Sequence, residues 1–135
     1  MTLRCLIVDD SARFLDAARS LLERQGITVV GVASTSAEAL MRAAELRPDV
    51  TLVDIDLGGE SGLELARQLG RGGDVAPSSL ILISAHAEQD YVDLIAESMV
   101  AGFLSKSALS AGAICGLLGP CDGDPLDPVS GPRGR

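Results

Sequence analysis

Charged and hydroxyl side chains stand where the apolar runs of this chain end. Asp9 and Asp10 follow the first run, Asp54 ends the third, Ser84 ends the fourth and Lys106 follows the fifth. Clustered carboxylates repel one another unless a cation is present, and Mg²⁺ prefers oxygen ligands. A carboxylate can also attack phosphorus, while an ammonium and a hydroxyl bind phosphoryl oxygens. These residue types indicate a site for a divalent cation and a phosphoryl group.

Short apolar runs that alternate with helical segments must position these side chains. The runs predict strands at Leu3–Val8, Ile27–Ala33, Val50–Val53, Leu80–Ile83 and Gly102–Ser105. The helical spacing falls in Ser11–Gln25, Thr35–Leu46, Leu63–Leu69, Glu88–Met99 and Ala108–Leu118. This alternation predicts an α/β fold, a doubly wound parallel sheet with helices on both faces. Because ligands bind beyond the carboxyl ends of such strands, the five side chains are expected to form one site.

Local signals mark two helix starts. Thr35 followed by Glu38 is a capping-box pattern, and Ser107 is placed to cap a last helix that starts at Ala108. Gly26 and Pro48 stop the first two helices.

Length and composition bound the organisation of the chain. Its 135 residues suffice for one domain with a core, but not for two. We expect this domain at residues 1–118 and a disordered tail or linker, rich in proline and glycine, at residues 119–135.

Charge and hydropathy exclude several classes of partner. The net charge is −8 and no run is rich in lysine or arginine, which disfavours direct binding of nucleic acid. No apolar run approaches the length of a membrane span, and the start does not resemble a signal peptide. The three cysteines have no metal-ligand spacing and fit a reducing compartment. We therefore expect a cytoplasmic protein without membrane contact.

Four segments, taken in order, carry a family resemblance. They are LIVDD at 6–10, LVDIDLGGESGLEL at 52–65, LILISA at 80–85 and AGFLSKSA at 101–108. Together they resemble the receiver domain of bacterial two-component response regulators, over residues 3 to about 118. The Lys-Ser-Ala sequence is similar to receivers that precede LuxR-type DNA-binding domains. The resemblance implies a flavodoxin-like, five-stranded sheet in the order 2-1-3-4-5.

The resemblance assigns the acidic residues to a phosphorelay site. Asp54 would be the phosphoacceptor, and Asp10 and Asp54 would bind Mg²⁺ directly. Asp9 would act mainly through water, and the main-chain carbonyl of Asp56 would complete the metal shell.

The remaining site residues would sense or stabilise the phosphoryl group. Lys106 would contact it, and Ser84 and Phe103 would occupy the two switch positions. Asp56 and His86, two residues beyond Asp54 and Ser84, flank the phosphoryl group in the family. We predict that both tune the lifetime of the phosphorylated form, because they can orient or exclude water.

The implied partner is a histidine kinase or a histidine phosphotransfer protein, which would dock on the first helix near Ala12, Phe14 and Leu15. The readout would appear on the fourth and fifth helices. Because the domain would modify only itself and turn over no external substrate, we do not expect an enzyme.

The last helix suggests a further contact surface. No charged residue lies between Lys106 and Asp122, and glycines recur at 112 and 116. We expect Leu109, Ala113 and Leu117 to face the core, which leaves Ser110, Cys115 and Leu118 on an uncharged opposite face. This favours a homodimer or a protein partner across the fourth and fifth helices. The alternative is a weak helix, because each interior glycine costs about 1 kcal/mol relative to alanine.

Two departures from the family pattern leave alternatives open. Ser107 stands where proline is common after the lysine, and Gly58 stands where proline is frequent. One alternative is a degenerate receiver that binds partners without phosphorylation. Another is the receiver part of a DNA-binding transcriptional regulator whose output domain is missing. A third is a phosphatase with an aspartate nucleophile, because Asp54-Ile55-Asp56 fits its Asp-x-Asp motif.

Overall fold

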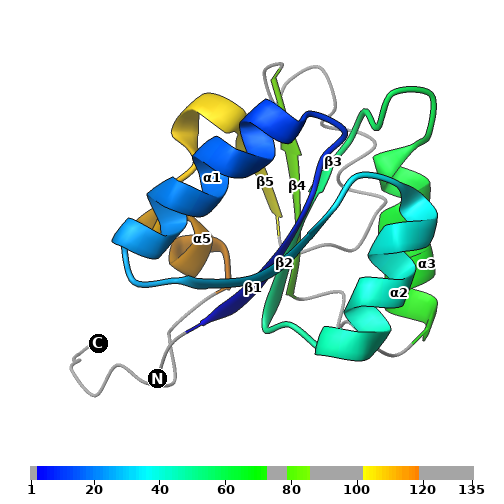
Figure 1. The fold of residues 1–135 in the computed structure, drawn as a ribbon, viewed down its shortest axis with the longest axis horizontal. Helices are drawn as coiled ribbons and strands as arrows, with labels where there is room; N and C mark the ends of the chain where they lie inside the picture. Colours follow the sequence, from blue (N-terminus) through cyan, green and yellow to red (C-terminus); the bar gives the residue numbers. More distant parts are fainter. Residues whose placement is uncertain (1–2, 73–78, 86–101, 119–135) are drawn as a thin grey trace.

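Five parallel strands lie at the centre of the fold, in the order β2-β1-β3-β4-β5 (Figure 1). The computed structural model describes residues 3–72, 79–85 and 102–118. The strands are β1 (Arg4–Val8), β2 (Thr28–Ala33), β3 (Val50–Asp54), β4 (Leu80–Ser84) and β5 (Gly102–Ser105). The predicted α/β class and strand order are confirmed, and each strand lies within one residue of its expected bounds.

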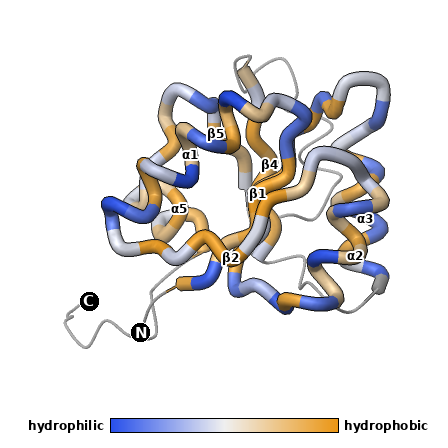
Figure 2. The backbone as a smooth tube through the Cα atoms, in the orientation of Figure 1, coloured by the Kyte–Doolittle hydropathy of each residue, from blue (hydrophilic) through white to orange (hydrophobic). Residues whose placement is uncertain are grey.

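Helices cover both faces of the sheet. Helices α1 (Ala12–Arg24) and α5 (Ala111–Leu118) lie on one face, and α2 (Ser36–Leu46) and α3 (Gly62–Gly72) lie on the other (Figure 1). Each layer encloses its own apolar cluster. Along β1, Leu6 and Val8 enter the cluster under α2 and α3, while Ile7 enters the one under α1 and α5. Successive strand side chains point to opposite faces, so a strand buried on both sides is apolar throughout (Figure 2).

Side-chain caps fix where the first two helices begin. The hydroxyl of Ser11 accepts a hydrogen bond from the amide of Phe14 at 3.2 Å, and the hydroxyl of Thr35 accepts one from Glu38 at 3.1 Å. The Thr35 cap confirms the predicted helix start. The carboxylate of Glu38, however, accepts from the amide of Ser34 at 2.8 Å, one residue before the cap position. The first turn of each helix is thus supplied with acceptors for its free amides.

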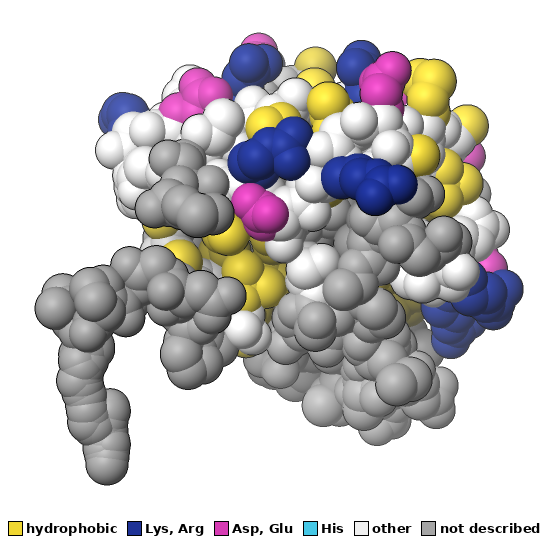
Figure 3. All heavy atoms as spheres, turned by 90° about the horizontal axis from the view of Figure 1, so that it is seen from below, with side chains coloured by type: hydrophobic (Ala, Val, Ile, Leu, Met, Phe, Trp, Pro, Cys, Tyr) yellow, Lys and Arg dark blue, Asp and Glu magenta, His cyan; other side chains and the backbone are white. Residues whose placement is uncertain are grey.

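Arg4 joins the start of β1 to the end of α2. Its guanidinium donates to the carbonyl of Leu46 at 2.8 Å and to that of Arg47 at 3.0 Å. These carbonyls carry the negative end of the helix dipole, which a cation stabilises. Figure 3 shows the molecule from below, where basic, acidic and hydrophobic side chains of the described residues all reach the surface. Asp9 and Asp54 lie at the opposite edge, where β1 and β3 end.

The predicted start of the last helix is wrong. Residues Lys106–Ala108 form a 3₁₀ turn, and α5 begins only at Ala111. Ser110, not Ser107, caps it: its hydroxyl accepts from the amide of Ala113 at 3.0 Å. The side chain of Gln25, at the end of α1, accepts from the amide of Ala111 at 2.6 Å. A tertiary contact therefore helps to set this helix start.

The core face of α5 also differs from the prediction. Ile114 is fully buried, and Leu118, expected on the opposite face, packs against the same cluster as Leu117. Gly112 and Gly116 are exposed. The predicted helix at Glu88–Met99 and the predicted tail at residues 119–135 lie outside the described residues. Within the described ranges, no helix is long and apolar enough to cross a membrane.

Candidate functional site

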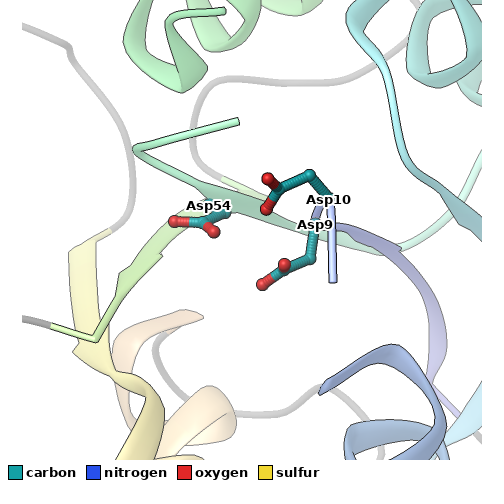
Figure 4. A group of neighbouring side chains, drawn as sticks. All are labelled: Asp9, Asp10 and Asp54. Atoms are coloured by element: carbon teal, nitrogen blue, oxygen red, sulfur yellow. The ribbon is translucent and has the colours of Figure 1, made fainter. Parts of the chain in front are cut away.

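Three aspartates meet at the edge of the sheet where the strands end. Val8 of β1 pairs with Val53 of β3, so Asp9 and Asp54, the next residues, come side by side. Figure 4 shows Asp9 and Asp10 reaching this edge from the end of β1, and Asp54 reaching it from the end of β3. One carboxylate oxygen from each lies within 4.8 Å of the others. The parallel register therefore assembles the acidic cluster that the sequence predicts.

Lys106 binds the buried Asp9 more closely than it binds Asp54. Its Nζ lies 2.6 Å from Asp9 Oδ2 and 3.1 Å from Asp54 Oδ2. Asp9 is fully buried, and its other oxygen accepts a hydrogen bond from the amide of Ser11 at 2.8 Å. A buried carboxylate is costly unless it is paired and hydrogen-bonded. The lysine and the first amide after β1 together satisfy this requirement.

Asp54 carries a raised pKa. Burial raises the pKa of this carboxyl from its ordinary 3.8 to about 6. Hydrogen bonds from the amide of Asp56 and from Lys106, both at 3.1 Å, oppose the rise, and the charge of Asp9 adds to it. At neutral pH the carboxylate is therefore ionised but poorly solvated, with both oxygens directed by hydrogen-bond donors.

The pKa of Lys106 moves in the direction that keeps it charged. Burial lowers this pKa, but the hydrogen bonds and charges of Asp9 and Asp54 outweigh burial and raise it overall. The ammonium also lies 4.4 Å from the centre of the Phe14 ring on α1, a cation–π contact. Sequence reasoning placed Phe14 on a docking surface and missed this role. No local signal reveals it, because Phe14 on α1 and Lys106 in the turn after β5 are far apart in the sequence.

The three carboxylates fit a hard divalent cation. Asp10 is exposed, whereas Asp9 and Asp54 are buried, so the cluster opens to solvent on one side. With Lys106 the cluster holds three carboxylates and one ammonium, which leaves an excess of negative charge. Carboxylate oxygens are the ligands that Mg²⁺ takes while keeping several waters. This donor set supports Mg²⁺ rather than a softer metal.

The other predicted site residues lie at the same edge or outside the described chain. Ser84 is buried at the end of β4 and pairs in register with Ser105, directly before Lys106. Phe103 is buried in the cluster under α2 and α3. Asp56 is exposed, and its side chain accepts from the amide of Gly58 at 3.2 Å. His86 lies outside the described residues.

The sequence from residue 5 to residue 114 matches the family model of the response regulator receiver domain. The chain belongs to this family. Membership sets the receiver apart from the phosphatases with an aspartate nucleophile, and it agrees with the strand order and with the acidic cluster at the strand ends.

Known relatives place the receiver among two-component proteins. It is 32% identical to the response regulator GacA of Pseudomonas viridiflava over 108 residues, which cover 78% of this chain and 49% of GacA. A crystal structure of a LuxR-family two-component response regulator from Aurantimonas sp. SI85-9A1 is similar at a TM-score of 0.70 and 28% identity, covering 79% of this chain and 76% of that one.

A third similar protein was crystallised in a modified state. It is a response regulator from Burkholderia pseudomallei with a phosphorylated aspartic acid, a calcium ion and citrate, at a TM-score of 0.70 and 25% identity. The match covers 83% of this chain and 64% of that chain. The receiver thus spans about half of the curated GacA sequence and 76% of the Aurantimonas response regulator chain.

Proposed function

We propose that this receiver is a Mg²⁺-dependent phosphoacceptor switch, in which Asp54 receives a phosphoryl group from a histidine kinase or a histidine phosphotransfer protein. One observation carries the proposal. The Asp54 carboxylate lies buried between Asp9, Asp10 and Lys106, ionised at neutral pH but with a pKa raised to about 6. A poorly solvated carboxylate beside a fixed ammonium is suited to attack a phosphoryl group. The phosphorylated aspartic acid of the similar Burkholderia pseudomallei protein supports the same chemistry.

The transfer exchanges one bond to phosphorus for another. The phosphorus–nitrogen bond of a phosphohistidine breaks, and an Asp54 carboxylate oxygen bonds to phosphorus to give an acyl phosphate. The imidazole leaves with the electron pair of the broken bond. Lys106, whose Nζ lies 3.1 Å from Asp54 Oδ2, would pair with a phosphoryl oxygen, and the hydroxyl of Ser84, at the end of β4, would donate a hydrogen bond to another.

Asp10 and Asp54 would hold Mg²⁺ directly, Asp9 would act mainly through water, and the main-chain carbonyl of Asp56 would complete the shell. The open side at Asp10 and the excess of carboxylates over ammonium support this arrangement. When bound, Mg²⁺ would offset negative charge on the transferring group.

The switch would connect the site to the protein surface through Ser84 and Phe103. Ser84 is buried at the end of β4, and Phe103 is buried within β5. A change at the phosphoryl group would therefore alter the packing of buried side chains rather than the position of an exposed loop. Phosphorylation would then bias two conformations of the surface formed by the fourth and fifth helices.

Asp56 and His86 are proposed to tune the lifetime of the phosphorylated form. Asp56 is exposed beside Asp54, where it can orient or exclude attacking water. We expect Asp56→Asn and His86→Ala to change the rate at which the phosphorylated protein decays. Equal decay rates in the wild type and both variants would contradict this role.

Helix α1 is the proposed docking surface for the phosphoryl donor. Ala12 is exposed and Phe14 is half-buried, so both can contact a partner. Leu15 is buried in the core and cannot contribute, which corrects the expectation from the sequence. Because the Phe14 ring covers Lys106, a partner on α1 would lie against the site itself.

Self-association or a protein partner across α5 is a further part of the proposal. Gly112 and Gly116 are exposed there, so another helix could approach closely. Light scattering with and without a phosphoryl mimic tests the dimer. A monomer under both conditions would count against it.

A second candidate output is control of a DNA-binding domain. The similarity to a LuxR-family regulator and the greater length of GacA favour it. In either case the receiver modifies only itself, so we propose no turnover of an external substrate. The reading frame beyond Arg135 tests for such a domain.

Intact-protein mass after incubation with acetyl phosphate and Mg²⁺ tests the central proposal. We expect one added phosphoryl group that depends on Mg²⁺ and is absent from Asp54→Asn. Addition that persists in Asp54→Asn would contradict Asp54 as the acceptor. If neither acetyl phosphate nor a histidine kinase modifies the protein, it is a degenerate receiver.

A further inference from the structure

Gly58 lies against the least restrained carboxylate of the acidic cluster. It follows β3 in the loop to α3 and has a φ of +60°. A Cβ atom built on Gly58 would lie 2.5 Å from Asp10 Oδ2 and 3.4 Å from Asp10 Cγ. Non-bonded heavy atoms pack favourably at about 3.5–4.0 Å, so this approach is a collision. With the backbone of Gly58 in this left-handed conformation, which the proline frequent at this position in the family cannot adopt, the Asp10 carboxylate occupies the space that a side chain would fill.

The three aspartates differ in how firmly they are held. Asp9 is fixed by the amide of Ser11 and by Lys106, and Asp54 by the amide of Asp56 and by Lys106. Within the described residues, no hydrogen bond or ion pair restrains the Asp10 carboxylate. Its orientation therefore depends on the space available beside it, and one wall of that space is Gly58.

We propose that Gly58 is a positioning residue of the cation site, because its missing side chain lets the Asp10 carboxylate lie within reach of Asp9 and Asp54. The inference rests on the proposed Mg²⁺ site. A side chain at position 58 would turn the exposed Asp10 carboxylate away from the cluster, which the flexible end of an aspartate does easily. Such a variant would fold with two of its three carboxylates in place and bind the cation more weakly.

The same loop offers a matched control. Gly59 has a φ of +106° and nothing within 4 Å of a built Cβ. Alanine therefore strains the backbone at both positions, but only at position 58 does it meet Asp10. Backbone strain alone would affect Gly59→Ala at least as much as Gly58→Ala. A loss of metal affinity through Asp10 would affect Gly58→Ala only.

Calorimetric titration of the full chain with MgCl₂ tests the proposal, with the Mg²⁺-dependence of the unfolding midpoint as a second readout. We expect Gly58→Ala to bind Mg²⁺ about 10-fold to 100-fold more weakly than the wild type, the range for residues that orient metal ligands. We expect Gly59→Ala to bind it like the wild type. Circular dichroism without metal checks that both variants are folded.

Two outcomes would overturn the inference while leaving the proposed function intact. The first is wild-type affinity in Gly58→Ala, which would mean that Asp10 does not depend on the space at position 58. The second is an equal loss in Gly59→Ala, which would assign the effect to loop strain. A wild type that binds no Mg²⁺ would instead overturn the cation site itself, and the role of Gly58 with it.

Discussion

Asp54→Asn should stabilise the metal-free protein at neutral pH. In the folded protein the pKa of Asp54 is about 6 instead of the ordinary 3.8, chiefly because of burial. Between these pH values the native state holds a proton that the unfolded chain has released. The free energy of unfolding therefore falls as the pH rises from 3.8 to about 6, and the loss is complete above that range. Asparagine cannot ionise, so the variant avoids this loss.

The size of the gain follows from the two pKa values. At about 1.4 kcal/mol for each pH unit between them, the ionised Asp54 costs about 3 kcal/mol at about pH 7.5. The amide of asparagine cannot accept from both Lys106 and the amide of Asp56, which removes about 1 kcal/mol of this gain. We therefore expect Asp54→Asn to be about 2 kcal/mol more stable at about pH 7.5, and less than about 1 kcal/mol more stable at about pH 5.

Urea denaturation in EDTA, followed by circular dichroism at both pH values, measures these differences. Asp16→Asn is the matched control, because Asp16 is an exposed carboxylate on α1 and its loss changes the net charge equally. We expect this control to lie within about 0.5 kcal/mol of the wild type. The reasoning is refuted if Asp54→Asn is no more stable than the wild type at about pH 7.5, or if its advantage does not shrink toward about pH 5.

Three further predictions concern Lys106, two glycines and Cys5. Lys106→Met should lower the free energy of unfolding by about 3 kcal/mol in urea denaturation, because it leaves Asp9 buried without its cation; a loss below about 1 kcal/mol would mean that water replaces the ammonium. Gly62→Ala should lower the free energy of unfolding by about 3 kcal/mol in the same assay, because its Cβ would collide with the backbone carbonyl of Asp54. Gly116→Ala has open space around its Cβ and should raise the free energy of unfolding by up to about 1 kcal/mol. Burial raises the pKa of the Cys5 thiol to about 12, so peptide mapping should find Cys5 alkylated by iodoacetamide in urea but not in the native protein; rapid native alkylation would contradict its burial.

The sequence alone determined the elements and the side chains at their ends. The apolar run before Asp9 predicts a strand that ends at Val8, because a charged side chain is costly inside a strand that is buried on both faces. Strand ends that share one edge then bring Asp9, Asp10, Asp54 and Lys106 together without further information. The cap at Thr35 was predictable for the same reason, since a helix start needs acceptors within a few residues.

Only the tertiary structure decided how these groups interact. Lys106 pairs most closely with Asp9, the Phe14 ring covers its ammonium, and burial raises the pKa of Asp54. Gln25, far along the chain, helps to start α5 at Ala111, where the local sequence suggested Ala108. Hydrophobic periodicity tells which face of an element is buried, but not the distance between two elements after packing. Ion pairs, ring contacts and desolvation depend on that distance, so they form only when the layers close around the sheet.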